Sequence, residues 1–208
     1  MNSRSPARPG PKPKIGTREK LIQSGLQSIH TSGYGATSIQ SIVEMADVPK
    51  GSFYNYFESK EEFAAEVIDA YSARGQDRLR SFLNDKNVAP LDRLQAYFDD
   101  RIEAFRASQF VRGCLMGNFS AEAADQSALI REGLTRHFGA WCDLFAACIA
   151  EAQAKRKISD QFPASLLAKF VLNSWEGALL RMRAEKSDAP LLDFKEIVFK
   201  KILETKAP

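Results

Sequence analysis

The 208-residue chain has little of what disulfide-stabilised, metal-binding or membrane proteins need. Its three cysteines are an odd number without a CxxC or Cys/His metal spacing, and it has two histidines. We therefore expect reduced thiols, a cytoplasmic location and no metal site. The longest apolar run, Leu144 to Ala150, is far shorter than the roughly 20 residues that cross a bilayer. The basic start runs into Pro and Gly, which argues against a secretory signal.

The contents of glycine and proline are also modest, as is the net charge. Twelve Gly and nine Pro are too few for a fibrous or wholly disordered chain, and 44% apolar residues suffice for a core in one or two small domains. Residues 1–60 carry eight Lys/Arg against four Asp/Glu, whereas residues 61–208 carry 21 against 22. The positive excess at the N-terminal end indicates a polyanionic partner there.

Residues 1–14, MNSRSPARPGPKPK, are predicted to form a flexible basic arm. Four Pro and one Gly disfavour a helix, and the four cations have no acidic partner within this segment. A solvated tail without a specific role is the alternative interpretation.

From residue 17 onward the apolar residues recur at helical spacing, without strand-like alternation. Thr37 with Gln40 and Ser59 with Glu62 read as capping boxes that open the second and fourth helices, and a short third helix begins at Pro49. Five longer helices follow, at Pro90 to Phe105, Leu115 to Ala124, Ser127 to Lys155, Pro163 to Lys186 and Leu191 to Glu204. The predicted fold class is all-α, with a three-helix domain at 15–60 and a helical bundle at 61–208.

The third predicted helix, residues 49–57, has two different sides. Phe53 and Phe57 are four residues apart and define a buried side. The outer side is small, polar and aromatic, and it consists of Lys50, Gly51, Ser52, Tyr54, Asn55 and Tyr56. Such a face suits a DNA major groove, and with the preceding helix it predicts a helix-turn-helix. Partial packing beside Phe53 is the alternative role for the two tyrosines.

Residues 17–63 closely resemble the DNA-binding domain of TetR-family transcriptional repressors, through the GYGATS turn, the SIVEMADV helix, the PKGSFYNYF recognition helix and the SKEEF segment. The resemblance implies double-stranded operator DNA as a partner. It gives as base-reading candidates Gln40, Lys50, Gly51, Ser52, Tyr54 and Asn55. It gives as phosphate contacts Thr37, Ser38, Tyr56 and Lys60. Arg4 and Arg8 of the basic arm are expected to reach the adjacent minor groove.

The same resemblance implies a homodimer on a near-palindromic operator, with half-sites roughly 34–36 Å or somewhat further apart. The segments Phe162 to Arg183 and Leu191 to Leu203 are rich in apolar residues. Two helices from each subunit would then form a four-helix interface. Completion of the monomer core is the alternative role for these segments.

The segments RGCLMGNFSAE, residues 112–122, and NSWEGALLRMRAE, residues 173–185, resemble the TetR-family branch that includes the NemR and AcuR regulators. Members of this branch respond to electrophiles or to small unsaturated acids such as acrylate, and the resemblance implies that Cys114 is the sensor. A helix start and the neighbouring Arg112 are expected to lower the pKa of its thiol. A buried, inert thiol is the alternative.

We expect a pocket for a small-molecule effector near Cys114, Trp175 and Glu176, with Arg181 and Arg183 suited to a carboxylate. Whether the ligand bonds covalently is left open, and Trp175 as plain core is the alternative. An effector that prefers a conformer with misplaced recognition helices must release DNA. The fourth helix, from Lys60, is the expected lever.

Enzyme motifs are missing from the sequence. It has no Gly-rich phosphate loop, no GxSxG and no HExxH, and we expect neither catalysis nor a cofactor. A helical adaptor that does not bind DNA is the competing class of function. That class would leave the polar outer face of the third helix without a role.

Overall fold

The computed structural model describes residues 16–204, and its regular structure is helical throughout this range. Its α-helices are α1 Thr17–Ser32, α2 Ile39–Met45, α3 Lys50–Phe53, α4 Lys60–Leu83, α5 Pro90–Ala107, α6 Leu115–Ala123, α7 Ala128–Ala154, α8 Ala164–Glu185 and α9 Ala189–Ile197. The predicted all-α class is confirmed. The predicted basic arm, with Arg4 and Arg8, lies outside the described residues.

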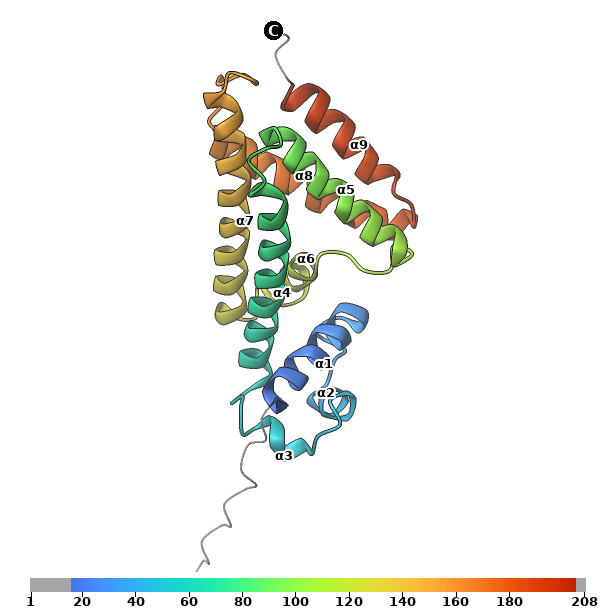
Figure 1. The fold of residues 1–208 in the computed structure, drawn as a ribbon. Helices are drawn as coiled ribbons and strands as arrows, with labels where there is room; N and C mark the ends of the chain where they lie inside the picture. The colour runs from blue at the N-terminus through green and yellow to red at the C-terminus, as the bar shows by residue number, and fades with distance from the viewer. Residues whose placement is uncertain (1–15, 205–208) are drawn as a thin grey trace, which may run out of the picture.

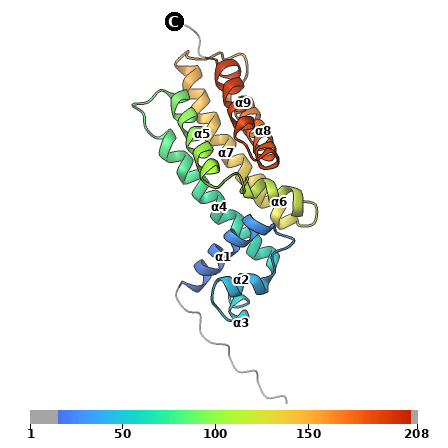
Figure 2. The ribbon, with the colours of Figure 1, turned by 90° about the vertical axis from the view of Figure 1, so that its right-hand side faces the viewer.

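The long helices α4 and α7 pack side by side and form the axis of the molecule (Figure 1). At one end, α1, α2 and α3 gather around the start of α4 (Figures 1 and 2). At the other end, α5 packs against α4 and α7, α8 packs against α7, and α9 covers α5 and α8 (Figure 1). Because α4 packs against both α1 and α5, it mechanically connects the two ends of the molecule.

The caps of the short helices differ in part from the predicted ones. Ser38, not Thr37, is the N-cap of α2, because its side chain accepts a hydrogen bond from the backbone N–H of Ser41 at 3.0 Å. The Ser41 hydroxyl in turn lies 3.1 Å from the Ser38 backbone nitrogen, so this pair takes the role predicted for Thr37 and Gln40. Ser59 caps α4 as predicted, by accepting from the Glu62 backbone N–H.

Two predicted helices are longer than the observed ones. The third ends at Phe53, and residues 54–56 form a turn instead of continuing to Phe57. The last α-helix ends at Ile197 and passes into a π-helix, Val198–Ile202, whose wider turn places the Leu203 N–H on the Val198 carbonyl at 2.7 Å. Over residues 16–204, each helix is too short or too polar to cross a membrane.

Aromatic rings fix α3 against the start of α4. The ring centroids of Phe53, Phe57 and Phe63 lie 4.9 to 5.2 Å apart, and all three side chains are buried. Gly25 of α1 lets that helix approach, since a Cβ there would lie 2.3 Å from the Phe63 ring. The prediction that Phe53 and Phe57 face inward is confirmed, and burial of each ring stabilises the domain by roughly 1.5–3 kcal/mol.

Candidate functional site

The first candidate surface lies on α3 and the turn that follows it. Tyr54 is 55% exposed, although its neighbour Phe53 is fully buried. Lys50, Gly51 and Asn55 are exposed as well, and a Cβ at Gly51 would meet no atom within 4 Å. Ser52 and Tyr56, on the same short helix and the turn after it, are half-buried. The residues predicted to form the outer face therefore lie together.

A tight turn sets the angle between α2 and α3. Asp47 has a φ of 53°, in the left-handed region that Asp tolerates better than most residues. The backbone N–H of Val48 donates to the Val43 carbonyl at 3.0 Å and closes the turn. With Val43 buried and α3 held by its phenylalanines, the exposed face has a fixed orientation relative to α2.

The predicted phosphate contacts at the start of α2 separate into a buried and an exposed residue. Thr37 is only 3% exposed, and its hydroxyl donates to the Gly33 carbonyl at 2.7 Å. This side chain fixes the turn between α1 and α2 and does not face solvent, contrary to the expectation. Ser38 is exposed, with its hydroxyl occupied by the cap of α2.

Gln40 lies in α2, before α3 in the chain, and Lys60 begins α4, after α3. The exposed Gln40 side chain donates to the Glu44 carboxylate at 2.6 Å. Lys60 is half-buried: its ammonium donates to the Tyr34 carbonyl at 2.7 Å and lies 4.3 Å from the centre of the Tyr34 ring. Burial lowers the pKa of this ammonium, which a nearby Glu122 partly offsets.

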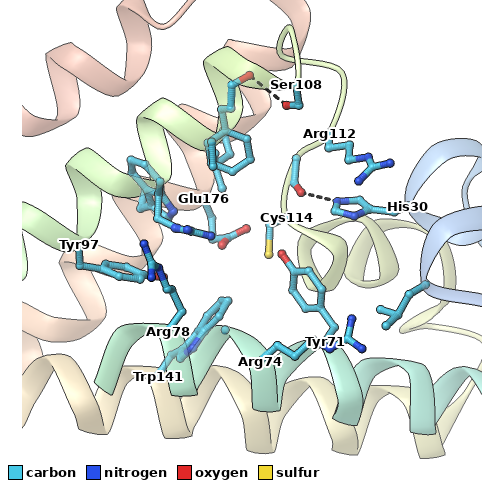
Figure 3. A pocket seen from close by; sticks show the side chains of 18 of the residues that line it. His30, Tyr71, Arg74, Arg78, Tyr97, Ser108, Arg112, Cys114, Trp141 and Glu176 are labelled. Carbon is cyan, nitrogen blue, oxygen red and sulfur yellow. Dashed lines mark hydrogen bonds between the residues drawn. The ribbon is translucent and has the colours of Figure 1, made fainter. Parts of the chain in front are cut away.

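The second candidate site is a cavity of about 690 Å³ between the two ends of the molecule (Figure 3). Side chains from α1, α4, α5, α7 and α8 and from the segment before α6 line it. The α1 contribution comes from Gln23, Leu26, Gln27 and His30. A ligand in this cavity would therefore touch the same helix that packs behind α2. Among the described residues, no group of three His, Cys, Asp or Glu side chains is placed to hold a metal ion.

Arginines dominate the charge of the cavity wall, with Arg74, Arg78, Arg101 and Arg112 lining it. Arg78 and Arg101 share the carboxylate of Asp100, and the bond from Arg78 is the main reason why the pKa of that carboxyl is lowered. Arg74 and Arg112 have no ion-pair partner within residues 16–204. Two guanidinium groups thus remain available to a polar ligand.

Cys114 and Glu176 meet inside the cavity and point toward each other, with the Tyr71 hydroxyl beside them (Figure 3). Cys114 is 6% exposed and caps α6 by accepting from the Gly117 N–H at 3.5 Å, and the neighbouring Glu176 carboxyl affects the pKa of its thiol. Burial raises the pKa of Glu176 to about 7.

The expected low pKa of the Cys114 thiol is wrong. Burial, with the neighbouring charge of Glu176 as the second cause, raises this pKa well above its ordinary value. The hydrogen bonds at the start of α6 act in the predicted direction but are outweighed. The thiol is therefore protonated at neutral pH.

Trp175 forms part of the cavity wall and part of the core at once. Its ring centroid lies 4.8 Å from that of Phe98 and 5.1 Å from that of Phe194, and the side chain is 5% exposed. Both readings of this residue therefore hold. Trp141 of α7, which the sequence did not single out, also lines the cavity, and its indole N–H has no hydrogen-bond partner within residues 16–204.

The two arginines predicted for the pocket lie elsewhere. Arg181 is exposed and forms an ion pair with Glu185 at 2.7 Å on the outer side of α8. Arg183 donates to the Asn118 side chain at 2.8 Å and packs on Gly113, behind the cavity wall. The guanidinium groups that do line the cavity come from α4, α5 and the segment before α6.

Two contacts that the sequence did not reveal join the cavity to the N-terminal helices. His30 Nε2 of α1 lies 2.8 Å from the carbonyl of Gly113, directly before Cys114 (Figure 3). The Tyr71 hydroxyl of α4 lies beside Cys114 (Figure 3), and the backbone of Leu115, directly after it, is close enough to lower the pKa of that hydroxyl. The cysteine is thus flanked by anchors to both helices. No short motif signals such contacts, because the partners are far apart in the chain.

Comparison with known proteins identifies both halves of the chain. Residues 21–67 match the family of bacterial regulatory proteins called tetR, and residues 90–198 match the tetracyclin repressor-like C-terminal domain. The HTH-type transcriptional repressor DhaR of Mycobacterium sp. is 40% identical over 89% of this chain and 92% of its own length. The transcriptional regulator AcuR of Cereibacter sphaeroides is 34% identical over 85% of this chain and 80% of its own length.

The fold agrees with these relatives. The crystal structure of the reduced form of Escherichia coli NemR is 27% identical, superposes with a TM-score of 0.81, and covers 91% of this chain and 99% of that one. The matching families are transcriptional regulators and not enzymes. With an exposed helix-turn-helix at one end and a helical bundle behind it, the chain belongs to the TetR family of DNA-binding transcriptional repressors.

Proposed function

We propose that this repressor binds a near-palindromic operator as a homodimer and leaves it when a small molecule or electrophile occupies the cavity around Cys114. The observation that carries the proposal is the position of that cavity. It is lined by α1 of the DNA-binding end and by α8 of the bundle, so its contents and the orientation of the helix-turn-helix are physically linked.

In this proposal, the exposed face of α3 and of the turn that follows it recognises the base edges of the operator. Lys50, Ser52, Tyr54 and Asn55 supply the hydrogen-bonding groups, and Gly51 permits a close backbone approach. The support is that Lys50, Gly51, Tyr54 and Asn55 are exposed, with Ser52 half-buried beside them, while buried phenylalanine rings hold the other side of α3. Side chains held on an exposed helix in this way can reach base edges in a major groove.

Phosphate contact is assigned to the margins of the same surface. Ser38, Tyr56 and Lys60 are the phosphate-contact candidates, Gln40 stays a base-reading candidate, and Arg4 and Arg8 would extend the contact into the minor groove. Lys60 would exchange the Tyr34 carbonyl for a phosphate oxygen, a stronger acceptor for an ammonium group. Such contacts fix the position of the protein on the duplex without reading sequence.

The proposed dimer interface consists of the outer faces of α8 and α9, which lie next to each other on one side of the bundle (Figure 2). Large apolar side chains are exposed there, with 65% exposure at Leu180 and 43–54% at Leu166, Phe170, Leu192 and Ile197. Burial of apolar surface contributes about 25 cal/mol per Å², so pairing this face with a second copy is favourable. Two helices from each subunit would then form the interface.

Release follows from thermodynamic linkage. His30 of α1 contacts the Gly113 carbonyl, and a ligand that moves the segment 112–115 moves that contact. If the occupied cavity fits a different position of α1, the ligand weakens operator binding by the factor by which the operator weakens ligand binding. The shared helix α4 carries the same shift to Lys60.

The test is a titration with DNA from upstream of the regulator's own gene at two salt concentrations. We expect one dimer per palindrome, with affinity that falls steeply with salt. Addition of a small electrophile should release the DNA from the wild-type protein and leave the complex of the Cys114→Ser variant intact. Monomeric or salt-insensitive binding would contradict the proposal, and equal release from both proteins would contradict its covalent form.

A further inference from the structure

The most unusual feature of the cavity is the contact between a buried thiol and a buried carboxyl. Cys114 comes from the start of α6 and Glu176 from the middle of α8, and their side chains point toward each other in the cavity (Figure 3). A Cβ at Gly117 would lie 2.8 Å from Glu176 Oε2 and 3.6 Å from the Cβ of Cys114. Reactive cysteines are commonly activated by cations or helix starts that favour the thiolate. Here the nearest charge is negative and burial opposes ionisation, so an ordinary thiolate is suppressed.

The same contact supplies what a suppressed thiol needs in order to react. A carboxylate that lies beside the thiol is placed to remove its proton while a new bond forms at sulfur. Oε2 of Glu176 approaches the start of α6, near Gly117, while Oε1 is buried and has no hydrogen-bond partner in the described part of the chain. The carboxyl therefore still has hydrogen-bonding capacity within the cavity.

A second, independent observation indicates that the cavity holds a polar ligand. Trp141 is 7% exposed and lines the cavity, and its indole N–H has no partner among the described residues. An unmade hydrogen bond of a buried donor costs about 1–3 kcal/mol. A ligand carbonyl oxygen would accept a hydrogen bond from this indole N–H. The aromatic rings that line the cavity suit a flat, conjugated group.

We propose that Glu176 is the general base that activates Cys114 toward α,β-unsaturated carbonyl compounds bound in the cavity. This inference rests on the proposed function, in which the cavity senses small effectors, and it names both their chemical class and the residue that makes the thiol respond. It assigns to Glu176 a chemical role that is separate from ligand binding.

The reaction is a conjugate addition in which all atoms are accounted for. The Cys114 sulfur forms a bond to the β-carbon, the C=C π bond breaks, and its electron pair moves to the carbonyl oxygen as an enolate. The thiol proton goes to the Glu176 carboxylate and from there to the α-carbon. No oxidant, reductant or leaving group takes part, and the carboxylate is regenerated.

The variant Glu176→Gln separates this mechanism from simple thiolate chemistry by the sign of its effect. Glutamine keeps the size of the side chain but cannot take up the proton. It also removes a negative charge that raises the pKa of the thiol, so attack by a free thiolate would become faster. With Glu176 as the base, alkylation instead slows by about 10²-fold, the lower range of general acid–base catalysis.

The experiment measures the alkylation rate of full-length protein by methyl vinyl ketone at about pH 8, with each cysteine followed by peptide mass spectrometry. Cys142 is half-buried and does not line the cavity, so its rate serves as an internal control that must not change. Glu176→Asp, which keeps a carboxylate on a shorter side chain, should retain part of the Cys114 rate. An unreactive Cys114 in the wild type, or an equal or faster rate in Glu176→Gln, would overturn the proposal.

A measurement on the wild-type protein covers the case in which Glu176→Gln does not fold. Proton transfer to a carboxylate during bond formation slows the reaction in D2O, whereas a pre-formed thiolate reacts faster there. A normal isotope effect at Cys114 supports the proposal and an inverse one overturns it. Operator release is scored separately: alkylated protein that stays on DNA refutes the proposed function and leaves the role of Glu176 intact.

Discussion

The buried carboxyl of Glu176 makes the stability of the protein depend on pH in a direction that is unusual for an acid. Its pKa is raised from 4.5 to about 7 by burial. The folded protein therefore holds this proton more tightly than the unfolded chain does. The contribution is complete below pH 4.5 and is lost as the pH rises through 7, so this residue makes the protein less stable in mildly basic solution.

The magnitude follows from the size of the shift. Each pKa unit corresponds to about 1.4 kcal/mol, so the shift from 4.5 to about 7 corresponds to ~3 kcal/mol. Glu176→Gln removes the titrating group and keeps a neutral side chain of the same size. We expect the variant to lose about this much of the difference in unfolding free energy between pH 5 and pH 8, relative to the wild type.

The assay is urea unfolding of both proteins at the two pH values and at one protein concentration, because association would otherwise add to the apparent stability. His30 contributes with the opposite sign, since burial lowers its pKa. That contribution is present in both proteins and cancels in the comparison. An identical pH dependence in Glu176→Gln and wild type would refute the reasoning, as it would mean that the carboxyl is ionised and solvated in the fold.

The remaining predictions concern DNA binding, sensing and packing. Tyr54→Ala should cost roughly 1–3 kcal/mol at one operator position and relax specificity there, measured with a set of single-base operator variants. Lys60→Ala should weaken all sequences alike and reduce the salt dependence, in the same titrations. Cys114→Ser should keep its operator affinity but no longer dissociate when an electrophile is added, as measured by fluorescence anisotropy of labelled operator. Gly25→Ala should lower the melting temperature, because its Cβ would lie 2.3 Å from the Phe63 ring; an unchanged melting temperature would mean that α1 and α4 separate easily.

The helix-turn-helix was predictable because its information is local. The spacing of Phe53 and Phe57 defines the inner side of α3, and both rings are buried as that spacing requires. The errors there are also local. Ser38 and Thr37 are both good N-caps by composition, and the choice between them depends on which hydroxyl the α1–α2 turn consumes, namely that of Thr37.

The cavity was predictable only in part, because its chemistry depends on contacts between distant segments. Cys114 does cap a helix, as the sequence indicated, but the Glu176 carboxyl and the burial that raise its pKa come from the packing of α8. Trp175 and Met182 are buried on one side of α8, which turns Arg181 toward solvent. Helical phase alone could have excluded Arg181 from the pocket, whereas Arg74 and Arg112 required the fold.

The location of the cavity constrains how the proposed sensing can work. A site enclosed entirely by the bundle would need a chain of shifts to reach DNA, whereas this cavity has α1 as one wall and α4 as another. The volume of the cavity therefore depends on the position of α1. This helix packs against α2, which in turn packs against α3. Because coupling is reciprocal, an operator that fixes α1 in one position must favour one shape of the cavity. Gly113 and Leu115, on either side of Cys114 in the chain, lie against His30 of α1 and Tyr71 of α4, so a group added at Cys114 expands the wall next to both helices.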